Sequence, residues 1–137
     1  MAKKLSILLD LNVILDVLQN RQPFYTESAK VLDAVVQQKA QGFVAAHSVT
    51  TLFYLLTRLR DRKTAVSIID ELLNVTAVAP VTDAAIRRAF GWGWSDFEDA
   101  VQMAAALETN VDYLVTRNVR DFQSAILPVV QPAAFLA

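Results

Sequence analysis

Aspartates occur at three separated places in the 137-residue sequence where a carboxylate could do chemistry. Asp10 directly follows an apolar run, Asp99 lies in a helix-like stretch rich in alanine, and Asp121 stands in a polar segment. A carboxylate at the mouth of a buried strand is costly unless it is paired, hydrated or bound to metal. Since Mg²⁺ and Mn²⁺ prefer oxygen ligands, these positions predict a divalent-metal site. The alternative for Asp10 is a helix N-cap.

The second acidic segment runs from Ser95 to Asp99. Ser95 and Glu98 fit a capping box, which explains Glu98 without any function. We expect Asp96 at the first helical position, where the helix dipole favours an anion, and Asp99 one turn further on the same side. Asp99 has no capping task and is therefore the more informative carboxylate, although a solvated surface position is its alternative.

The third segment follows another apolar run and contains Thr116, Asn118 and Asp121. These residues supply three oxygen groups, and Arg117 and Arg120 add cations suited to phosphate. The alternatives are a short-helix cap for Asp121 and an ordinary loop of surface polar residues. Each of the three segments is weak evidence alone, whereas their joint placement after strands and at a helix start is stronger.

Short apolar strands that alternate with amphipathic helices must position these residues. The alternation predicts βα units in a three-layer α/β/α sandwich with a central, mainly parallel sheet of four or five strands. In such sheets, sites form beyond the carboxyl ends of the strands where the strand order switches. Asp61 and Thr82 are predicted helix N-caps. Strands are expected at 5–9, 42–46, 75–81, 111–116 and 126–130, and helices at 13–18, 29–36, 47–59, 61–73, 82–90 and 95–110.

Length and composition limit the class of protein. The chain has no repeat or linker-like tract, so we expect one domain over residues 1–137, and the 54% apolar content predicts a thick core with an apolar subunit interface. The absence of cysteine excludes disulfides and thiolate metal sites. No stretch approaches a membrane span or a signal peptide, which favours a soluble cytoplasmic protein. With a net charge of −1, nucleic acid would have to be bound through local patches and metal ions.

Other segments have two interpretations. Trp92, Trp94 and Phe97 lie beside the second acidic segment, where core or dimer packing is favoured over stacking on unpaired bases. The basic run 57–63 is read as a solvated helix end, with RNA backbone contact as the alternative. His47, the single histidine, is expected to form a structural hydrogen bond rather than to act in catalysis.

The acidic segments together resemble the PIN domain family, in particular its VapC-type toxin-like ribonucleases. The resemblance covers nearly the whole chain and implies a parallel sheet with a nuclease pocket that depends on Mg²⁺ or Mn²⁺. It also implies RNA as substrate, a 5′-phosphate and a 3′-hydroxyl on the products, an antitoxin protein as partner, and a homodimer. The segments that carry it are Leu8 to Val13, Asp96 to Ala100, Val115 to Asn118, and Asp121 with Phe122.

The resemblance also implies roles for individual residues. Asn12 would brace Asp10, while Thr116, Arg117 and Asn118 would position water or phosphate. One departure is Thr51, which is expected near the substrate and stands where the family usually has a glutamate. Asn118 replaces another usual acid. The residues expected to hold one or two metal ions, partly through water, and to carry catalysis are Asp10, Asp96, Asp99 and Asp121.

Two alternatives follow from these departures. A PIN-like module with a degenerate site could bind nucleic acid or protein without cleaving, as Thr51 and Asn118 would favour. A phosphohydrolase of the haloacid-dehalogenase type is less favoured, because Asn12 stands where that family repeats an aspartate after Asp10. Aspartyl-phosphate trapping would support that reading, because its chemistry is covalent.

Overall fold

Five parallel strands form the centre of the structure, a computed structural model that describes residues 4–122 and 126–136. The strand order is β3-β2-β1-β4-β5, and each neighbouring pair is parallel. The order reverses at β1, since the chain moves to one side for β2 and β3 and to the other for β4 and β5. The strands are β1 (Leu5–Leu9), β2 (Ala40–Ala45), β3 (Ala77–Ala79), β4 (Tyr113–Val115) and β5 (Val129–Val130).

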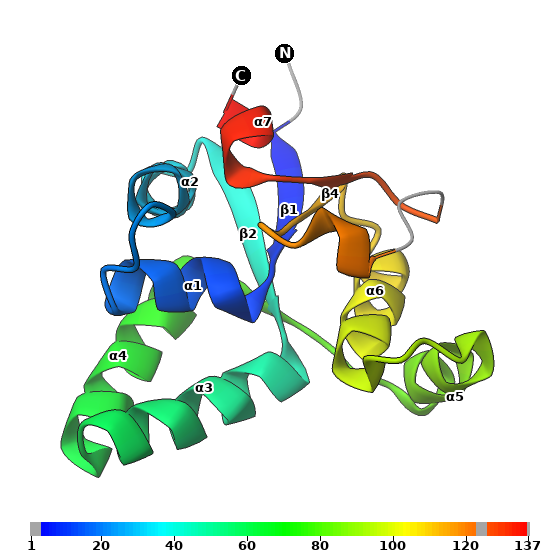
Figure 1. The fold of residues 1–137 in the computed structure, drawn as a ribbon, viewed down its shortest axis with the longest axis horizontal. Coiled ribbons are helices and arrows are strands. Elements are labelled where there is room, and N and C mark those ends of the chain that lie inside the picture. The colour runs from blue at the N-terminus through cyan, green and yellow to red at the C-terminus, as the bar shows by residue number, and fades with distance from the viewer. Residues whose placement is uncertain (1–3, 123–125, 137) are drawn as a thin grey trace.

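Helices cover both faces of this sheet. Figure 1 shows α1 to α4 on one side of the strands and α5 with α6 on the other. This arrangement confirms the predicted three-layer α/β/α architecture. Within the described residues no helix is long and apolar enough to cross a membrane. The helices are α1 (Leu11–Leu18), α2 (Tyr25–Val36), α3 (Ala46–Leu59), α4 (Arg62–Val75), α5 (Asp83–Trp92), α6 (Phe97–Thr109) and α7 (Pro132–Leu136), with a 3₁₀ turn η1 (Val119–Asp121).

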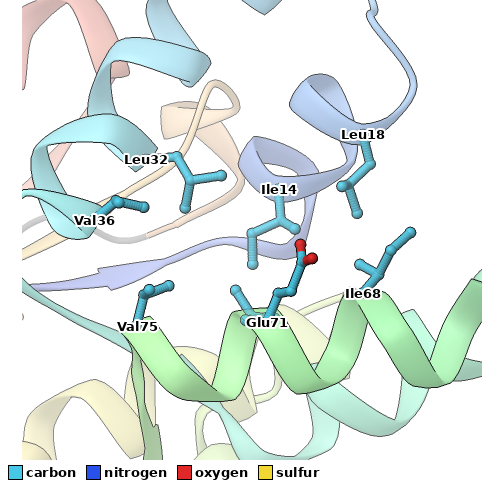
Figure 2. Close-up of a pocket in the computed structure, with 8 residues that line it drawn as sticks. Ile14, Leu18, Leu32, Val36, Ile68, Glu71 and Val75 are labelled. Carbon is cyan, nitrogen blue, oxygen red and sulfur yellow. The ribbon is translucent and has the colours of Figure 1, made fainter.

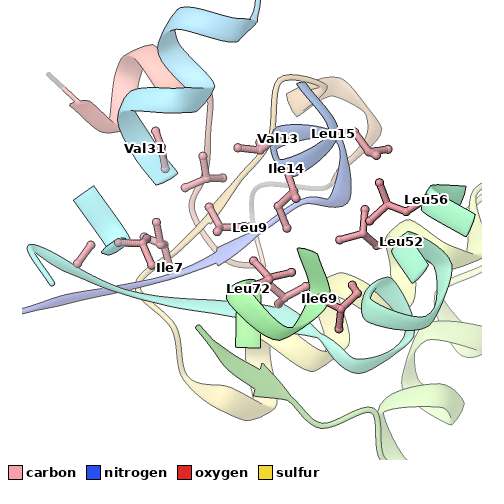
Figure 3. Packing of buried hydrophobic residues seen from close by; sticks show 14 of the residues in the cluster. Ile7, Leu9, Val13, Ile14, Leu15, Val31, Leu52, Leu56, Ile69 and Leu72 are labelled. Carbon is pink, nitrogen blue, oxygen red and sulfur yellow. The ribbon is translucent and has the colours of Figure 1, made fainter. Parts of the chain in front are cut away.

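The central strand β1 divides the core into two parts because successive side chains of a strand point to opposite faces. Ile7 and Leu9 pack into the cluster under α1 to α4, which Figure 3 shows from close by. Leu8 packs on the opposite side with Met103 of α6. The side chains of Ile7, Leu8 and Leu9 are all fully buried. The strand is therefore apolar on both faces, and Asp10 is the first polar side chain beyond it.

The boundaries of several elements differ from the expected ones. Val75 ends α4, so β3 is only three residues long instead of covering 75–81. Asn110 ends α6 in the left-handed conformation, φ 59°, and β4 starts only at Tyr113. Residues 123–125, which precede the expected fifth strand, lie outside the described residues. After β5 the chain closes with the short helix α7, Pro132–Leu136.

The predicted helix caps have different outcomes. Asp61 and Thr82 both cap, as their side chains accept hydrogen bonds from the backbone N–H groups of Thr64 (2.6 Å) and Ala85 (3.0 Å). The capping box of Ser95 and Glu98 is wrong, because α6 starts one residue later than expected, at Phe97. The N-cap is Asp96, whose carboxylate is at least as good an acceptor as a serine hydroxyl.

Candidate active site at the carboxyl end of the sheet

Asp10 follows β1 and is buried, with only 3% of its surface exposed. Its Oδ1 accepts a 3.0 Å hydrogen bond from Nε2 of Gln102, and its Oδ2 accepts a 2.7 Å bond from Oγ1 of Thr116. Asp10 occupies the N-cap position of α1, but its side chain forms no capping hydrogen bond. Both oxygens therefore face α6 and the end of β4, so Asp10 is the N-cap by position, as the alternative interpretation expects, but its carboxylate is free of any capping bond.

The hydrogen bonds to Asp10 cross the place where the strand order reverses. Leu9 of β1 pairs with Val115 of β4, and the backbone N–H of Asp10 donates to the carbonyl of Val115 at 2.9 Å. Thr116, the next residue, is fully buried and is held by β5 through Val130, whose carbonyl accepts from its N–H at 3.0 Å. The sheet thus fixes Asp10 and Thr116 side by side at the edge where parallel α/β sheets form ligand sites.

The start of α6 supplies two further carboxylates. Oδ1 of Asp96 accepts a 3.1 Å hydrogen bond from the backbone N–H of Asp99, so Asp96 is the N-cap and not the first helical residue. Asp96 is exposed, whereas Asp99 is partly buried one turn further on. His47, at the start of α3, contacts the carbonyl of Glu98 through Nε2 at 3.2 Å. This contact fits the structural hydrogen bond expected for His47.

Electrostatic repulsion is concentrated on Asp99. Burial, and after it the negative charges of Asp96, Asp10 and Asp121, together raise the pKa of its carboxyl to about 7. The four carboxylates therefore lie within Coulombic range of one another, although they come from β1, α6 and η1. Without a cation, the protein accommodates this crowding by keeping a proton on Asp99 at slightly acidic pH.

The third segment folds as a tight turn after β4. Oγ1 of Thr116 accepts a 3.1 Å hydrogen bond from the N–H of Asn118, and the carbonyl of Asn118 accepts from the N–H of Asp121 at 3.0 Å. Asp121 is exposed and is the last residue of η1, so it does not cap that turn. Thr116 hence links Asp10 to the segment that carries Asp121.

Two residues expected near the substrate have other surroundings. Asn12 is not among the groups that hydrogen bond to Asp10, whose two oxygens receive Gln102 and Thr116 instead. The hydroxyl of Thr51 donates to the carbonyl of His47 at 3.0 Å, within its own helix. The contacts of Thr51 therefore give no support to a role near the metal ion or the substrate.

Arg117 is engaged in an ion pair instead of being free to meet phosphate. Its Nε lies 3.0 Å from Oδ2 of Asp16, which is fully buried in α1, and its guanidinium lies 4.2 Å from the ring centroid of Phe24. Ser28 donates a further hydrogen bond to Asp16 at 3.3 Å. This pair fastens the turn after β4 to the helix that begins beside Asp10.

Sequence reasoning missed Gln102 and Asp16. Gln102 is 3% exposed, and in sequence it is a lone amide in the mostly apolar and small run 100–106 of α6. A single amide in a buried helical run must find a partner, and that was the available signal. Asp16 carried a similar signal, because it interrupts the apolar side of α1.

The donor chemistry of the site fits a hard divalent ion. Asp10, Asp96, Asp99 and Asp121 offer oxygen atoms only, and the repulsion around Asp99 is the kind that a cation removes. Within residues 4–122 and 126–136, no three acidic, histidine or cysteine side chains already stand close enough to enclose an ion directly. Coordination would therefore use water for some positions or draw the exposed carboxylates inward.

Comparison with known proteins agrees with this geometry. The sequence pattern of the PIN domain matches residues 6–120. Ribonuclease VapC1 of Aquifex aeolicus (strain VF5) is 25% identical over 134 residues, which are 94% of this chain and 92% of that protein.

Two solved structures show the same fold. A toxin–antitoxin complex from Klebsiella pneumoniae contains a chain with a TM-score of 0.70 and 19% identity, over 92% of this chain and 97% of that one. VapC20 of Mycobacterium tuberculosis, a toxin that cleaves the sarcin–ricin loop, has a TM-score of 0.64 and 16% identity, over 79% of this chain and 86% of that one.

Proposed function

The chain belongs to the PIN domain family, and from this premise we propose that it is a divalent-metal-dependent endoribonuclease that hydrolyses RNA phosphodiester bonds. The observation that carries the proposal is the crowding of Asp10, Asp96 and Asp121 around Asp99 at the carboxyl end of the sheet. A set of carboxylates that repel one another in this way is suited to a cation. The ribonuclease name of the Aquifex relative supports RNA as the substrate.

We assign the ion to Asp10, Asp96, Asp99 and Asp121, with Mg²⁺ or Mn²⁺ as the ion that their oxygen atoms favour. When bound, such an ion lowers the pKa of a coordinated water and stabilises charge on a phosphate in the transition state.

Neighbouring residues of the chain orient Asp10 through hydrogen bonds. Gln102 and Thr116 each donate to one of its oxygens, which fixes the orientation of the carboxylate. Asn118, which follows Thr116 in the same turn, is the residue we assign to positioning water or phosphate. Thr51 is not assigned to the ion, since its hydroxyl is committed within α3. We take residues 1–137 as one domain that acts in the cytoplasm.

RNA cleavage by the metal-free protein and by the protein with added Mn²⁺ tests the proposal. We expect cleavage only with Mn²⁺, its loss with chelator, and its loss in Asp10→Asn and Asp99→Asn. Asp70→Asn is the matched control, because Asp70 is an exposed aspartate on α4. Binding of RNA without cleavage at any metal concentration would instead establish the degenerate binding module.

We also propose that the chain is the toxin of a toxin–antitoxin pair, as the Klebsiella complex supports. An apolar groove of about 310 Å³ between α1, α2 and α4 is the surface we assign to the antitoxin (Figure 2). Leu18, Val36 and Val75 at this groove are exposed apolar side chains, which fit the apolar stripe of an amphipathic helix. Glu71 adds one carboxylate to the wall and favours a basic residue on that helix.

Co-expression with a small DNA-binding protein encoded upstream of this gene tests the antitoxin. We expect a complex that inhibits RNA cleavage and that Val36→Asp weakens. Val66→Asp is the matched control, because Val66 is an equally exposed valine (48% against 50%) that does not line the groove. An isolated gene, or a complex indifferent to Val36→Asp, would contradict the assignment.

A homodimer is proposed from apolar side chains on the other face of the molecule. Phe90 on α5 is 76% exposed, and its ring contacts that of the exposed Phe97 edge-to-face at 6.4 Å. Ile86, one turn before Phe90, is exposed as well. Sedimentation velocity should show a dimer that Phe90→Asp dissociates, whereas a monomeric wild-type protein would rule the dimer out.

A further inference from the structure

Next to the candidate active site lies a groove of about 500 Å³ that the hydrolysis of a phosphodiester does not by itself explain. Two of its walls are Asp96 and Asp121, which we assign to the ion, and another is the exposed side chain of Arg120. Trp92 and Trp94 form the aromatic part of the lining. The volume is within the range of about 300–1,000 Å³ that is usual for small-ligand sites.

The two tryptophans form a fixed aromatic platform. Their rings are stacked at 5.3 Å with an interplanar angle of 25°. Phe122 supports the platform from the side, since its ring meets that of Trp94 edge-to-face at 6.1 Å. Both tryptophans are only partly buried, so aromatic surface remains available. Because these rings are already held in place by one another and by Phe122, they lose little conformational entropy when a flat group stacks on them.

Gly93 opens the groove between the tryptophans. It ends α5 in the left-handed conformation at φ 68°, which other residues rarely adopt, and a Cβ placed on it would meet no heavy atom within 4 Å. The turn therefore leaves free space beside the platform.

Charged side chains of both signs line the groove beside the platform. Among the residues that the structure describes, Arg120 takes part in no ion pair, so its guanidinium is available to an anion. The carboxylates of Asp96 and Asp121 line the same groove and disfavour a bare anion that has no ring to stack on the platform. A ligand with a flat apolar ring and a phosphate at one end satisfies both conditions.

We propose that this groove is a subsite for one unpaired nucleotide of the RNA substrate, adjoining the phosphate that is cleaved. The base stacks on the platform formed by Trp92 and Trp94, and Arg120 contacts a backbone phosphate. A paired base keeps its faces hidden in the duplex, so the subsite selects single-stranded RNA. The inference rests on the proposed ribonuclease function and adds to it the residues that would bind an unpaired base.

The test uses the fluorescence of the protein itself, because Trp92 and Trp94 are the only tryptophans of the chain. Single-stranded RNA hexamers are titrated into the protein with EDTA present, so that no cleavage occurs. We expect saturable quenching of tryptophan emission by the hexamer. The same hexamer in a duplex, and tripolyphosphate, which has phosphates but no base, are expected to leave the emission unchanged.

Variants separate stacking from folding. Trp92→Leu should weaken hexamer binding roughly tenfold or more, whereas Trp92→Phe keeps an aromatic face and should stay within about threefold. Arg120→Ala should weaken binding about fivefold, and Arg88→Ala, an exposed arginine of α5 outside the groove, should not. Thermal unfolding of each variant shows whether a loss of hexamer affinity comes from a destabilised fold. A loss of stacking alone weakens binding in Trp92→Leu but not in Trp92→Phe.

The outcomes for the subsite and for the proposed function are distinct. Quenching that persists in a protein without ribonuclease activity supports the subsite and contradicts the hydrolysis. Metal-dependent cleavage without quenching, with Arg120→Ala and Arg88→Ala equal to wild type, overturns the subsite and leaves the hydrolysis standing. Equal quenching by duplex and single-stranded RNA also overturns the subsite.

Discussion

The hydroxyl of Thr116 donates a 2.7 Å hydrogen bond to Oδ2 of Asp10, across 106 positions of sequence. Both side chains are buried, and they follow neighbouring strands at the point where the strand order reverses. The contact joins the sheet to the site, because the same hydroxyl also accepts from the backbone of Asn118 in the turn that carries Asp121.

Replacing Thr116 by valine removes the hydroxyl at almost constant volume. One oxygen of the buried Asp10 then loses its partner, so we expect a loss of about 1–3 kcal/mol in the free energy of unfolding. Urea unfolding followed by circular dichroism measures it. Thr57→Val is the control, because that hydroxyl donates only to a backbone carbonyl within its own helix, and the cost should be below about 0.5 kcal/mol. Equal losses of stability in both variants would contradict a stabilising hydrogen bond from Thr116 to Asp10.

Replacing Gln102 by glutamate sets a second carboxylate against Asp10, 3.0 Å from its Oδ1. The repulsion and burial raise the pKa of the new glutamate in the folded state above about 4.3, its usual value. The folded variant therefore loses stability as the pH rises above that value, and we expect it to be at least about 1.4 kcal/mol less stable at pH 8 than at pH 5, relative to wild type.

Gln37→Glu is a matched control for this variant. Gln37 also donates to an aspartate, Asp33 at 2.8 Å, but the pair is exposed on the surface. Solvent screens the added repulsion there, so its cost should stay within about 0.5 kcal/mol. If Gln102→Glu showed no more pH dependence than Gln37→Glu, the proximity of Gln102 to the Asp10 carboxylate would be refuted.

The alternation of apolar strands and amphipathic helices was sufficient to predict the sheet, its layers and the edge on which the site lies. Local patterns could also locate Asp10, which ends an apolar run. They could not predict that Gln102 holds Asp10, because that contact joins positions 92 residues apart and depends on how α6 packs on the sheet. The start of α6 was misplaced by one residue because serine and aspartate are equally good caps. Arg117 looked like a free cation, since its partner Asp16 is about a hundred residues away.

Replacing Arg117 by methionine leaves the carboxylate of Asp16 buried without its closest cation. We expect a loss of about 3–5 kcal/mol in the free energy of unfolding. The exposed pair of Arg87 and Asp83 is a control, because Arg87→Met should cost no more than about 0.5 kcal/mol. The double variant Asp16→Leu with Arg117→Met should recover most of the loss, because no buried charge is left unpaired and Arg21, the second cation at Asp16, is 36% exposed to solvent. A double variant as unstable as Arg117→Met alone would contradict the ion pair as the cause.

The pKa of Asp99 gives a pH dependence with a definite sign. In the metal-free folded protein it is about 7, above the usual value of 3.8, so the folded state binds a proton that the unfolded state releases. Wild type therefore loses stability as the pH rises from about 4 to about 7, and the loss is complete above that. Asp99→Asn lacks this loss and should unfold at a higher temperature than wild type at pH 8 in EDTA, with a smaller difference at pH 5. A difference that does not change with pH would contradict the raised pKa.

We propose that the carboxylates around Asp99 share a divalent ion. Isothermal titration of Mn²⁺ into the metal-free protein at pH 6.5, in two buffers of different ionisation enthalpy, tests it most directly. We predict that wild type binds Mn²⁺ and releases roughly one proton, because the ion displaces the proton of Asp99, while Asp99→Asn binds at least roughly tenfold more weakly and releases none. Absence of Mn²⁺ binding by wild type, or equal affinity and equal proton release in Asp99→Asn, would contradict the claim.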